Sequence, residues 1–353
     1  MLERRLRDGG RAVARSFIRV ACRQCARMVG GVDLMTFVYA LIGMLGALLS
    51  PSGFAQSRVD CPPVAQAPSQ EQFEAGLRNG RDRGFLWRIT KDGHSSYLYG
   101  TLHVATLEWM FPGPTVSQAL RSSDTIALEL DVLDPSVQRR MALGMAAQPG
   151  APPLPEALER RLQRFIESEC VPRQMLEGLA PEAQIQVLQT LLGRRDGLDP
   201  AFGIDVFLAG WGRGANKPVV ALETTEIQLK ALRIGTTPAE KIEFVEEGLA
   251  ELENGNARTA LRRAAGAWAS SDLDTLSRYE SWCHCVNTAA DRLELKSLID
   301  ERNPAMANGI AAQHASGKRV FAAVGSLHMI GPSGLPALLA ERGYRVERIG
   351  AGN

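Results

Sequence analysis

Several common catalytic motifs are missing from this sequence of 353 residues. It contains no G-x-S-x-G nucleophile elbow, no H-E-x-x-H pair and no G-x-x-x-x-G-K-S/T phosphate loop. Each of these motifs positions the reacting groups of one enzyme class, so their absence argues against serine hydrolases, helix-based zinc proteases and P-loop enzymes. No pair of carboxylates or aromatic platform suited to sugar chemistry stands out either.

An excess of charge of one sign is also missing, since 40 Lys and Arg residues stand against 39 Asp and Glu residues. Such a chain has no overall electrostatic attraction to nucleic acid or to an anionic membrane surface. We therefore expect no nucleic-acid partner. The length allows a substantial core, in one large domain or two ordinary ones.

The longest apolar run lies near the start of the chain, at residues 34–49. An arginine-rich stretch precedes it, and small residues including Gly53 and Ala55 follow. This order is typical of a secretory signal peptide. It predicts a signal peptide over residues 1–55 and a periplasmic or secreted protein. The alternative is an uncleaved anchor in the inner membrane, although the run is shorter than the ~20 residues that span a bilayer comfortably.

Cysteine is sparse, and the cysteines beyond the predicted signal peptide are Cys61, Cys170, Cys283 and Cys285. An even number in an exported protein predicts two disulfides. Cys283 and Cys285 stand too close in sequence to pair comfortably, so we expect each to reach a distant partner, and Cys61 could meet either one. The alternative is that Cys-His-Cys belongs to a zinc site, but no further ligands stand at a usual spacing.

The remaining chain divides into a linker and a folded part. Residues 56–83 are rich in Pro, Gln, Ser and Ala and predict a linker. Near residue 84 a hairpin is expected, because two strand-like runs flank the turn sequence Asp92-Gly93. Residues 135–200 and 225–315 are predicted to be mainly helical. These features indicate a mixed α/β (α+β) fold, with a mixed β-sheet and a large helical layer or insertion.

Two nearly identical strings, Gly-Thr-Leu-His at 100–103 and Gly-Ser-Leu-His at 325–328, each end a predicted strand. Glycine lets the backbone turn sharply there, and the histidine then points into the crevice beyond the strand end. Imidazole is a frequent metal ligand and proton carrier. We therefore expect His103 and His328 to meet in one site. The strand–loop–helix–strand context around both strings suggests an internal duplication, with chance as the alternative.

A carboxylate, Glu129, fits the same site. Residues 124–131 predict a strand in which Glu129 points away from the apolar face. Two histidines and a carboxylate are a familiar ligand set for a catalytic divalent metal, which activates a bound water molecule. The alternative is a solvated residue on an edge strand.

Weaker candidates lie near other predicted element ends. Asp205 stands at a helix start, where the helix dipole favours an acid. Glu223 follows a predicted buried strand, Arg302 could hold a carboxylate or an oxyanion, and Asn303 suits a helix N-cap. For each of them a structural role is an equal alternative. A structural role is expected for the remaining histidines, which are His94, His284 and His314.

Several strings of the chain resemble those of a known family. The matching strings are YLYGTLHVA (97–105), IALELD (126–131), GIDVFLA…KPVVALET (203–224), ERN (301–303) and VGSLHMIGPSGLPALLAERGYRVERI (324–349). In this order they resemble the TraB/PrgY/GumN family, which includes the animal Tiki proteins that cleave Wnt. The bacterial GumN-like branch is the most similar. The resemblance covers residues 84–350 and implies one TraB/GumN-like domain there.

The resemblance also implies a fold and a site. The fold would be related to erythromycin esterase and ChaN-like proteins, and the site would be metal-dependent and peptidase-like. The family's proposed active residues are two GxxH histidines and a glutamate, which here are His103, His328 and Glu129. Residues matching the family's ERN and LET strings would assist them, namely Arg302, Asn303 and Glu223.

These observations together predict an exported metal-dependent hydrolase, specifically a peptidase. Its metal would be Mn²⁺, Co²⁺ or Zn²⁺, and its substrate a peptide or protein. One alternative is a protein that sequesters a peptide without cleaving it, as in pheromone shutdown. Another, based only on family naming, is an accessory protein of polysaccharide export.

Overall fold

The computed structural model describes residues 60–232 and 237–350. The predicted signal peptide at 1–55 lies outside these residues. Among the helices of the described ranges, none combines the length and the apolar character needed to cross a membrane.

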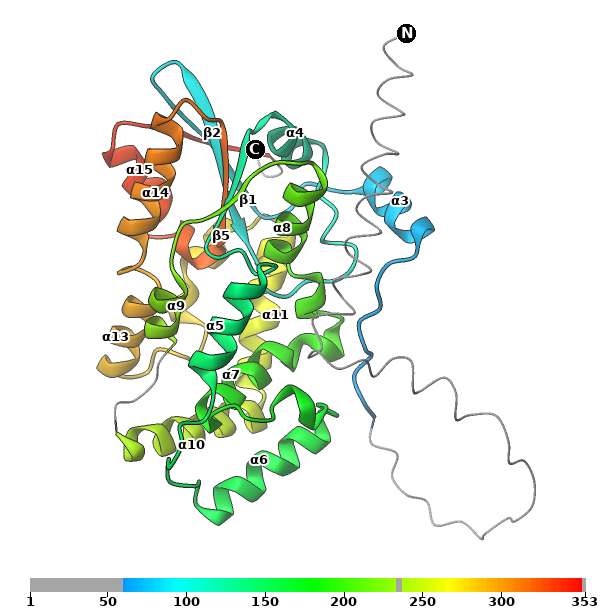
Figure 1. Cartoon of the computed structure of the whole chain (residues 1–353), viewed down its shortest axis with the longest axis vertical. Coiled ribbons are helices and arrows are strands. Elements are labelled where there is room, and N and C mark those ends of the chain that lie inside the picture. Colours follow the sequence, from blue (N-terminus) through cyan, green and yellow to red (C-terminus); the bar gives the residue numbers. More distant parts are fainter. Residues whose placement is uncertain (1–59, 233–236, 351–353) are drawn as a thin grey trace, which may run out of the picture.

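Within the described residues, a six-stranded mixed sheet forms the centre of the molecule, in the order β4-β3-β5-β2-β1-β6 (Figure 1). Strands β2, β5, β3 and β4 are parallel to one another, whereas β1 pairs antiparallel with both β2 and β6. The strands are β1 (Phe85–Lys91), β2 (His94–Thr101), β3 (Thr125–Leu128), β4 (Val219–Ala221), β5 (Val320–Gly325) and β6 (Arg345–Ile349).

The predicted hairpin is present. β1 and β2 pair from Phe85↔Gly100 to Lys91↔His94, and Asp92 and Gly93 form the turn with φ of 50° and 80°. Positive φ at both central residues matches the right-handed twist of the strands, which is why Asp-Gly is favoured there.

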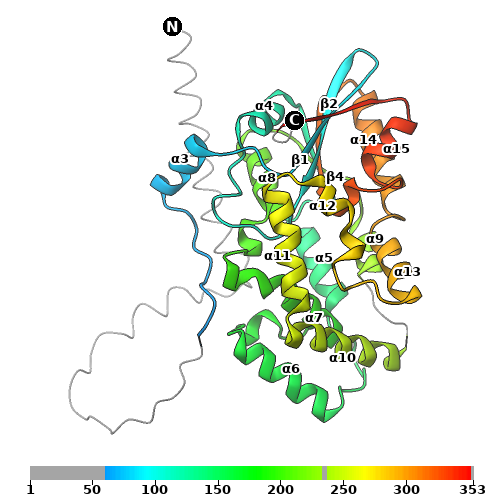
Figure 2. The ribbon, with the colours of Figure 1, turned by 180° about the vertical axis from the view of Figure 1, so that it is seen from behind.

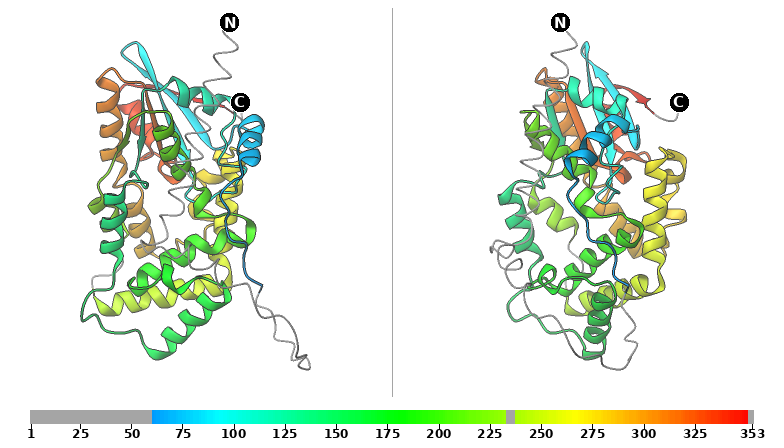
Figure 3. Two further views of the ribbon diagram at one scale, coloured as in Figure 1. Left: turned by 45° about the vertical axis from the view of Figure 1, so that its right-hand side comes forward. Right: turned by 90° about the vertical axis from the view of Figure 1, so that its right-hand side faces the viewer.

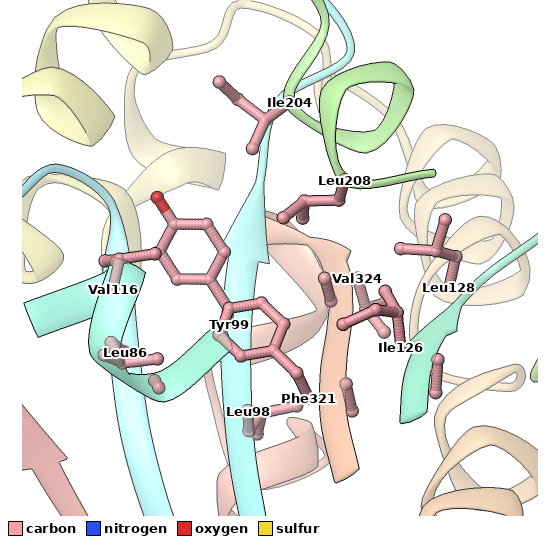
Figure 4. Packing of buried hydrophobic residues seen from close by; sticks show 14 of the residues in the cluster. Leu86, Leu98, Tyr99, Val116, Ile126, Leu128, Ile204, Leu208, Phe321 and Val324 are labelled. Atoms are coloured by element: carbon pink, nitrogen blue, oxygen red, sulfur yellow. The ribbon is translucent and has the colours of Figure 1, made fainter. Parts of the chain in front are cut away.

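Helices cover both faces of the sheet, so the central strands β3 and β5 are buried on both sides. α4 (Pro114–Ser122) and α8 (Ile204–Gly214) lie on one side, and α14 (Asn303–Ala315) and α15 (Leu335–Glu341) lie on the other (Figures 1 and 3). All four residues of β3 are buried. Figure 4 shows part of this core, in which side chains of α8 approach those of the central strands. The mixed α/β class predicted from the sequence is confirmed.

A second group of helices, the helical lobe, stands beyond the carboxyl ends of the parallel strands (Figures 1 and 2). It has its own apolar core, formed mainly by α6, α7 and α10. Its members are α5 (Pro135–Met145), α6 (Glu156–Ser168), α7 (Pro181–Leu191), α10 (Pro238–Asn254) and α11 (Asn256–Ala269). Gly255 adopts φ of 79° and separates α10 from α11 within the stretch predicted to be mainly helical.

The remaining helices are short and connect these layers. They are α3 (Gln70–Asn79), α9 (Thr225–Ala231), α12 (Leu273–Ser277), α13 (Ala289–Leu298) and the 3₁₀ turns η1 (Arg173–Met175), η2 (Leu192–Asp196), η3 (Pro200–Phe202), η4 (Tyr279–Ser281) and η5 (Ser326–Met329). The predicted duplication stays a prediction. Both units run strand–helix–strand, but β3 pairs parallel with β5, whereas β6 pairs antiparallel with β1.

The described part of the chain contains two disulfides, with a pairing that the sequence did not predict. Cys61 bonds Cys170, which ties the linker to the helical lobe. Cys283 bonds Cys285, so the expectation that each would reach a distant partner is wrong. The physical reason is the conformation of His284, whose φ of 58° accompanies a Cα–Cα distance of 5.1 Å between the two cysteines. That distance lies within the usual disulfide range.

Candidate functional site

The parallel strands end at one edge of the sheet, and the predicted site residues follow directly. His103 stands two residues after β2, Glu129 one residue after β3, and Glu223 two residues after β4. β2 and β5 end together, because Thr101 pairs with Gly325. Carboxyl ends of parallel strands are where α/β proteins gather binding groups. The topology therefore brings residues that are far apart in sequence to the same edge.

The side chains of His103, Glu129 and His328 lie around Gly325. A Cβ atom built on this glycine would lie 3.1 Å from Glu129 Oε1, 3.6 Å from His328 Cδ2 and 3.9 Å from His103 Nε2. The two GxxH histidines and the glutamate thus surround one point, as the repeated strings led us to expect. The absence of a side chain at Gly325 leaves this space open.

Glu129 reaches this point differently from the prediction. β3 ends at Leu128, so a strand through residue 131 is wrong, and Glu129 lies beyond the strand end. It is 9% exposed rather than solvated. Its Oε1 accepts a hydrogen bond of 2.7 Å from the Gly325 N–H, and its Oε2 accepts bonds from Arg302 Nη2 at 2.8 Å and Gln228 Nε2 at 3.1 Å. Both carboxylate oxygens are therefore engaged.

Arg302 joins the two glutamates. Its Nε donates to Glu223 Oε1 at 2.9 Å and its Nη2 to Glu223 Oε2 at 2.5 Å, while Nη2 also reaches Glu129. The Glu223 side chain is fully buried, and that of Arg302 is 9% exposed. Two buried carboxylates at close range need a cation to offset their negative charge, and the planar guanidinium supplies it in a bidentate geometry. The expectation that Arg302 could hold a carboxylate is met.

His328 is held rigidly in η5 and is 3% exposed. Its Nδ1 lies 2.6 Å from Asn303 Oδ1, and Asn303 Nδ2 donates to the Ser333 carbonyl. An amide oxygen only accepts, so Nδ1 carries the hydrogen and Nε2 faces the site, 3.4 Å from Arg302 Nη1. Asn303 is the first residue of α14 and not its N-cap, so that prediction is wrong. The side chain orients His328 instead.

The first histidine is placed quite differently from the second. The side chain of His103 is 64% exposed, and its Nδ1 lies 3.4 Å from Asp205 Oδ2. The Asp205 carboxylate raises the pKa of His103 to about 9. Since most of this side chain faces water, the attraction is screened and contributes little to stability. His103 thus stands at the mouth of the site, whereas His328 lies inside it.

The charges inside the site follow from burial and neighbours. Burial lowers the pKa of His328 to about 4, so His328 is neutral at pH 7. Burial would raise the pKa of Glu129, but the positive groups around it and the Gly325 N–H outweigh burial and lower it to about 2. At neutral pH this positive charge comes from Arg302 and His103. At neutral pH the site therefore contains a negative Glu129, a positive Arg302 and His103, and an uncharged His328.

Two imidazoles and a carboxylate are donor types that divalent metals bind. Each histidine directs its Nδ1 toward an oxygen, of Asp205 or Asn303, as metal-bound imidazoles commonly do. His103 Nε2 lies toward Gly325, whereas His328 Nε2 lies beside Arg302 Nη1. In the structure as it stands, however, no three His, Cys, Asp or Glu side chains of the described ranges are gathered closely enough to hold a metal ion. Arg302 instead occupies the space between the carboxylates.

Two neighbours of the site were not among the residues predicted to carry the chemistry. Gln228 in α9 contacts both Glu129 and Glu223, and no motif marked it in the sequence. Asp205 was only a weak candidate at a helix start. The signal for Asp205 is its place inside the string GIDVFLA, and that for Gln228 is its position just after residue 224, where the quoted strings end.

The fold and site define a mixed α/β protein with a histidine–carboxylate site at the carboxyl edge of its sheet. Residues 85–348 match the model of the TraB/PrgY/gumN family, and the chain belongs to that family. The predicted resemblance is thereby confirmed.

Individual relatives are distant. The chain is 25% identical to Metalloprotease TIKI1 of Danio rerio over 319 residues, which covers 76% of this chain and 63% of that protein. It is 28% identical over 263 residues to Uncharacterized protein YbaP of Shigella flexneri, covering 71% of this chain and 90% of that protein. The YbaP protein of Escherichia coli is 27% identical over the same length. No solved structure matches significantly.

Proposed function

We propose that this protein is an exported metal-dependent hydrolase that cleaves peptide bonds. The observation that carries the proposal is the meeting of His103, Glu129 and His328 around Gly325 at the carboxyl edge of the sheet. Membership of a family that includes a protein named as a metalloprotease supports the choice of reaction.

The residues of the chain would share the work as follows. The His103 side chain stands at the exposed mouth, where its Nε2 would be the outermost of the three metal ligands and the nearest to an incoming peptide. Arg302 holds Glu129 and Glu223 in place. His103, Glu129 and His328 would hold Mn²⁺, Co²⁺ or Zn²⁺, which when bound would polarise the carbonyl and activate water.

Export is supported by the disulfides of the described chain, since such bonds persist in oxidising compartments. Sequencing the amino terminus of the protein from a periplasmic or culture fraction tests this part. A start near residue 56 would support cleavage, whereas an intact amino terminus in the membrane fraction would support the anchor.

A peptide-library digest read by mass spectrometry tests the activity, with Mn²⁺, Co²⁺ and Zn²⁺ supplied separately. We expect cleavage by the wild type and none by Glu129→Gln or His103→Asn. Matched controls are Glu167→Gln and His284→Asn, which change exposed residues away from the site. Metal content by mass spectrometry should fall in the site variants only.

Three outcomes would contradict all or part of the proposal. Cleavage that persists in Glu129→Gln would place the activity elsewhere. Peptide binding without cleavage under any of the three metals would favour the sequestering protein. Equal cleavage with and without chelator would contradict the metal dependence but not the hydrolase activity.

A further inference from the structure

His103 is the one predicted site residue whose ring lies mostly in water, which raises the question of what holds it in place. An imidazole on a loop can rotate about its side-chain torsions, and a loosely held catalytic group loses rate. The other histidine, His328, is buried and fixed by Asn303. Among the described residues, the carboxylate that comes within ion-pair distance of the His103 ring is that of Asp205.

Asp205 is itself well placed for this role. It lies in the first turn of α8, its side chain is 15% exposed, and its Oδ2 is 3.4 Å from His103 Nδ1. Its other oxygen, Oδ1, is buried with no hydrogen-bond partner among the described residues. A buried carboxylate oxygen without a partner is costly, so it points to a functional demand on this side chain.

The backbone holds the two residues against each other. The Ile204 N–H donates to the Leu102 carbonyl at 2.9 Å, so the residues next to Asp205 and His103 are bonded directly. Two further backbone bonds join Ala105 and Asp199, at 3.2 Å and 2.9 Å. The start of α8 is therefore attached to the loop that carries His103, on both sides of the histidine.

A glycine permits this close approach. A Cβ atom on Gly203 would lie 2.7 Å from the His103 carbonyl oxygen and 3.0 Å from Asp205 Oδ1. The first distance is shorter than real Cβ contacts allow, so a larger residue would push α8 away from the loop. The Gly-Ile-Asp string thus serves to bring a carboxylate to His103.

We propose that Asp205 is the positioning residue of His103, accepting a hydrogen bond from Nδ1–H and thereby aiming Nε2 at the Glu129 and Gly325 side. Asp205 does for the exposed histidine what Asn303 does for the buried one. The 3.4 Å separation is that of the free protein, and such contacts shorten when substrate binds. The inference rests on the proposed function, because it assigns a role within that same site.

Kinetics of Asp205 variants on a cleaved peptide test the role. Asp205→Asn should lower kcat by about 10- to 100-fold with little change in KM, as loss of such an outer carboxylate does elsewhere. Asp205→Glu should recover part of this loss. The matched control is Glu182→Gln, another first-turn carboxylate with 16% side-chain exposure, whose Lys241 partner lies away from the site. An unchanged kcat in Asp205→Asn, with activity still lost in Glu129→Gln, would overturn the inference alone.

A second measurement needs no activity. The chain has only five histidines, so selective ¹⁵N-histidine labelling gives a simple spectrum in which His103→Asn assigns the His103 ring. We expect the His103 Nδ1–H proton to exchange with water more slowly in the wild type than in Asp205→Asn. Exchange in the wild type as fast as that of free imidazole would overturn the inference, even if Asp205→Asn failed to fold. Absence of any cleavage with a protected Nδ1–H would contradict the proposed function and not this contact.

Discussion

Arg302 is the residue on which the charges of the site depend. It is the guanidinium that contacts both Glu129 and Glu223, and all three side chains are at most 10% exposed. Replacing a whole buried salt bridge by apolar residues can leave the stability unchanged. Removing one partner is destabilising, because the remaining charges are then buried without an opposite charge. The sequence predicted that Arg302 could bind a carboxylate, because Arg suits that geometry. It could not predict which carboxylates, since these follow the ends of two strands, β3 and β4, that are distant from Arg302 in sequence.

Arg302→Met should therefore destabilise the protein by about 3–5 kcal/mol, because two carboxylates would remain buried without a cation. Urea unfolding at pH 7 measures this loss. Adding Glu223→Gln to the same chain should restore part of the stability. Arg319→Met, at an exposed pair with Asp124, should change it little. A loss no larger than that of Arg319→Met would contradict the account of the site charges.

A second buried polar group lies at the opposite end of the sheet, around His314. The Val320 N–H donates to Ser96 Oγ at 2.9 Å, and Ser96 Oγ lies 2.8 Å from His314 Nδ1. His314 Nε2 lies 3.1 Å from the Lys91 carbonyl, which only accepts. Nε2 therefore carries the hydrogen, and Nδ1 accepts from the Ser96 hydroxyl, so the neutral ring satisfies every bond. The structural role expected for His314 agrees with this arrangement.

The stability of the protein should depend on pH through His314. Burial lowers its pKa in the folded protein, and the stacked ring of His94 adds to this effect. The unfolded chain then binds the proton more readily, so this contribution is fully present above the ordinary histidine pKa of about 6.5 and is lost as pH falls below it. Unfolding free energies at pH 7.5 and 5.5 should differ more for the wild type than for His314→Gln. An equal or smaller difference in the wild type would contradict this.

At the scale of helices and strands, features set by the local sequence were predicted better than features set by long-range contacts. The hairpin at Asp92-Gly93 was predictable because the turn type requires those residues. The strand end after residue 128 was not, because alternation continues through residue 131 while Asp131 turns away to pair with Arg213 at 2.5 Å. The Cys283–Cys285 bond depends on one positive φ, which the sequence does not display. Errors thus fall where tertiary contacts override a local pattern.

At the scale of the whole molecule, the described residues form two main apolar cores, one around the sheet and one in the helical lobe. A small third cluster, at Val104, Leu198 and Ala265, contacts residues of both. The predicted site depended on strand topology, and the two GxxH strings were enough to predict the meeting point because parallel strands end at one edge. The lobe beyond that edge was expected only as helical segments, since the sequence carries no signal for how helices pack on a site.

The Cys61–Cys170 bond also acts on the whole molecule, since it connects the linker to the helical lobe across 109 residues. Arg195 Nη1 also donates to the Asp60 carbonyl at 2.7 Å beside it. A long closed loop restricts the unfolded chain far more than a short one. The Cys283–Cys285 bond spans a separation of only 2 residues.

The paired variant Cys61→Ser/Cys170→Ser should therefore lose roughly 2–4 kcal/mol of unfolding free energy, and Cys283→Ser/Cys285→Ser clearly less. Urea unfolding of both variants in the oxidised protein gives the comparison. The difference in unfolding free energy between the two variants should vanish in reductant, because neither bond then restricts the unfolded chain. Equal losses, or a larger loss in the short loop, would mean that these bonds act through native contacts around the lobe and around α13 rather than through the length of chain they close.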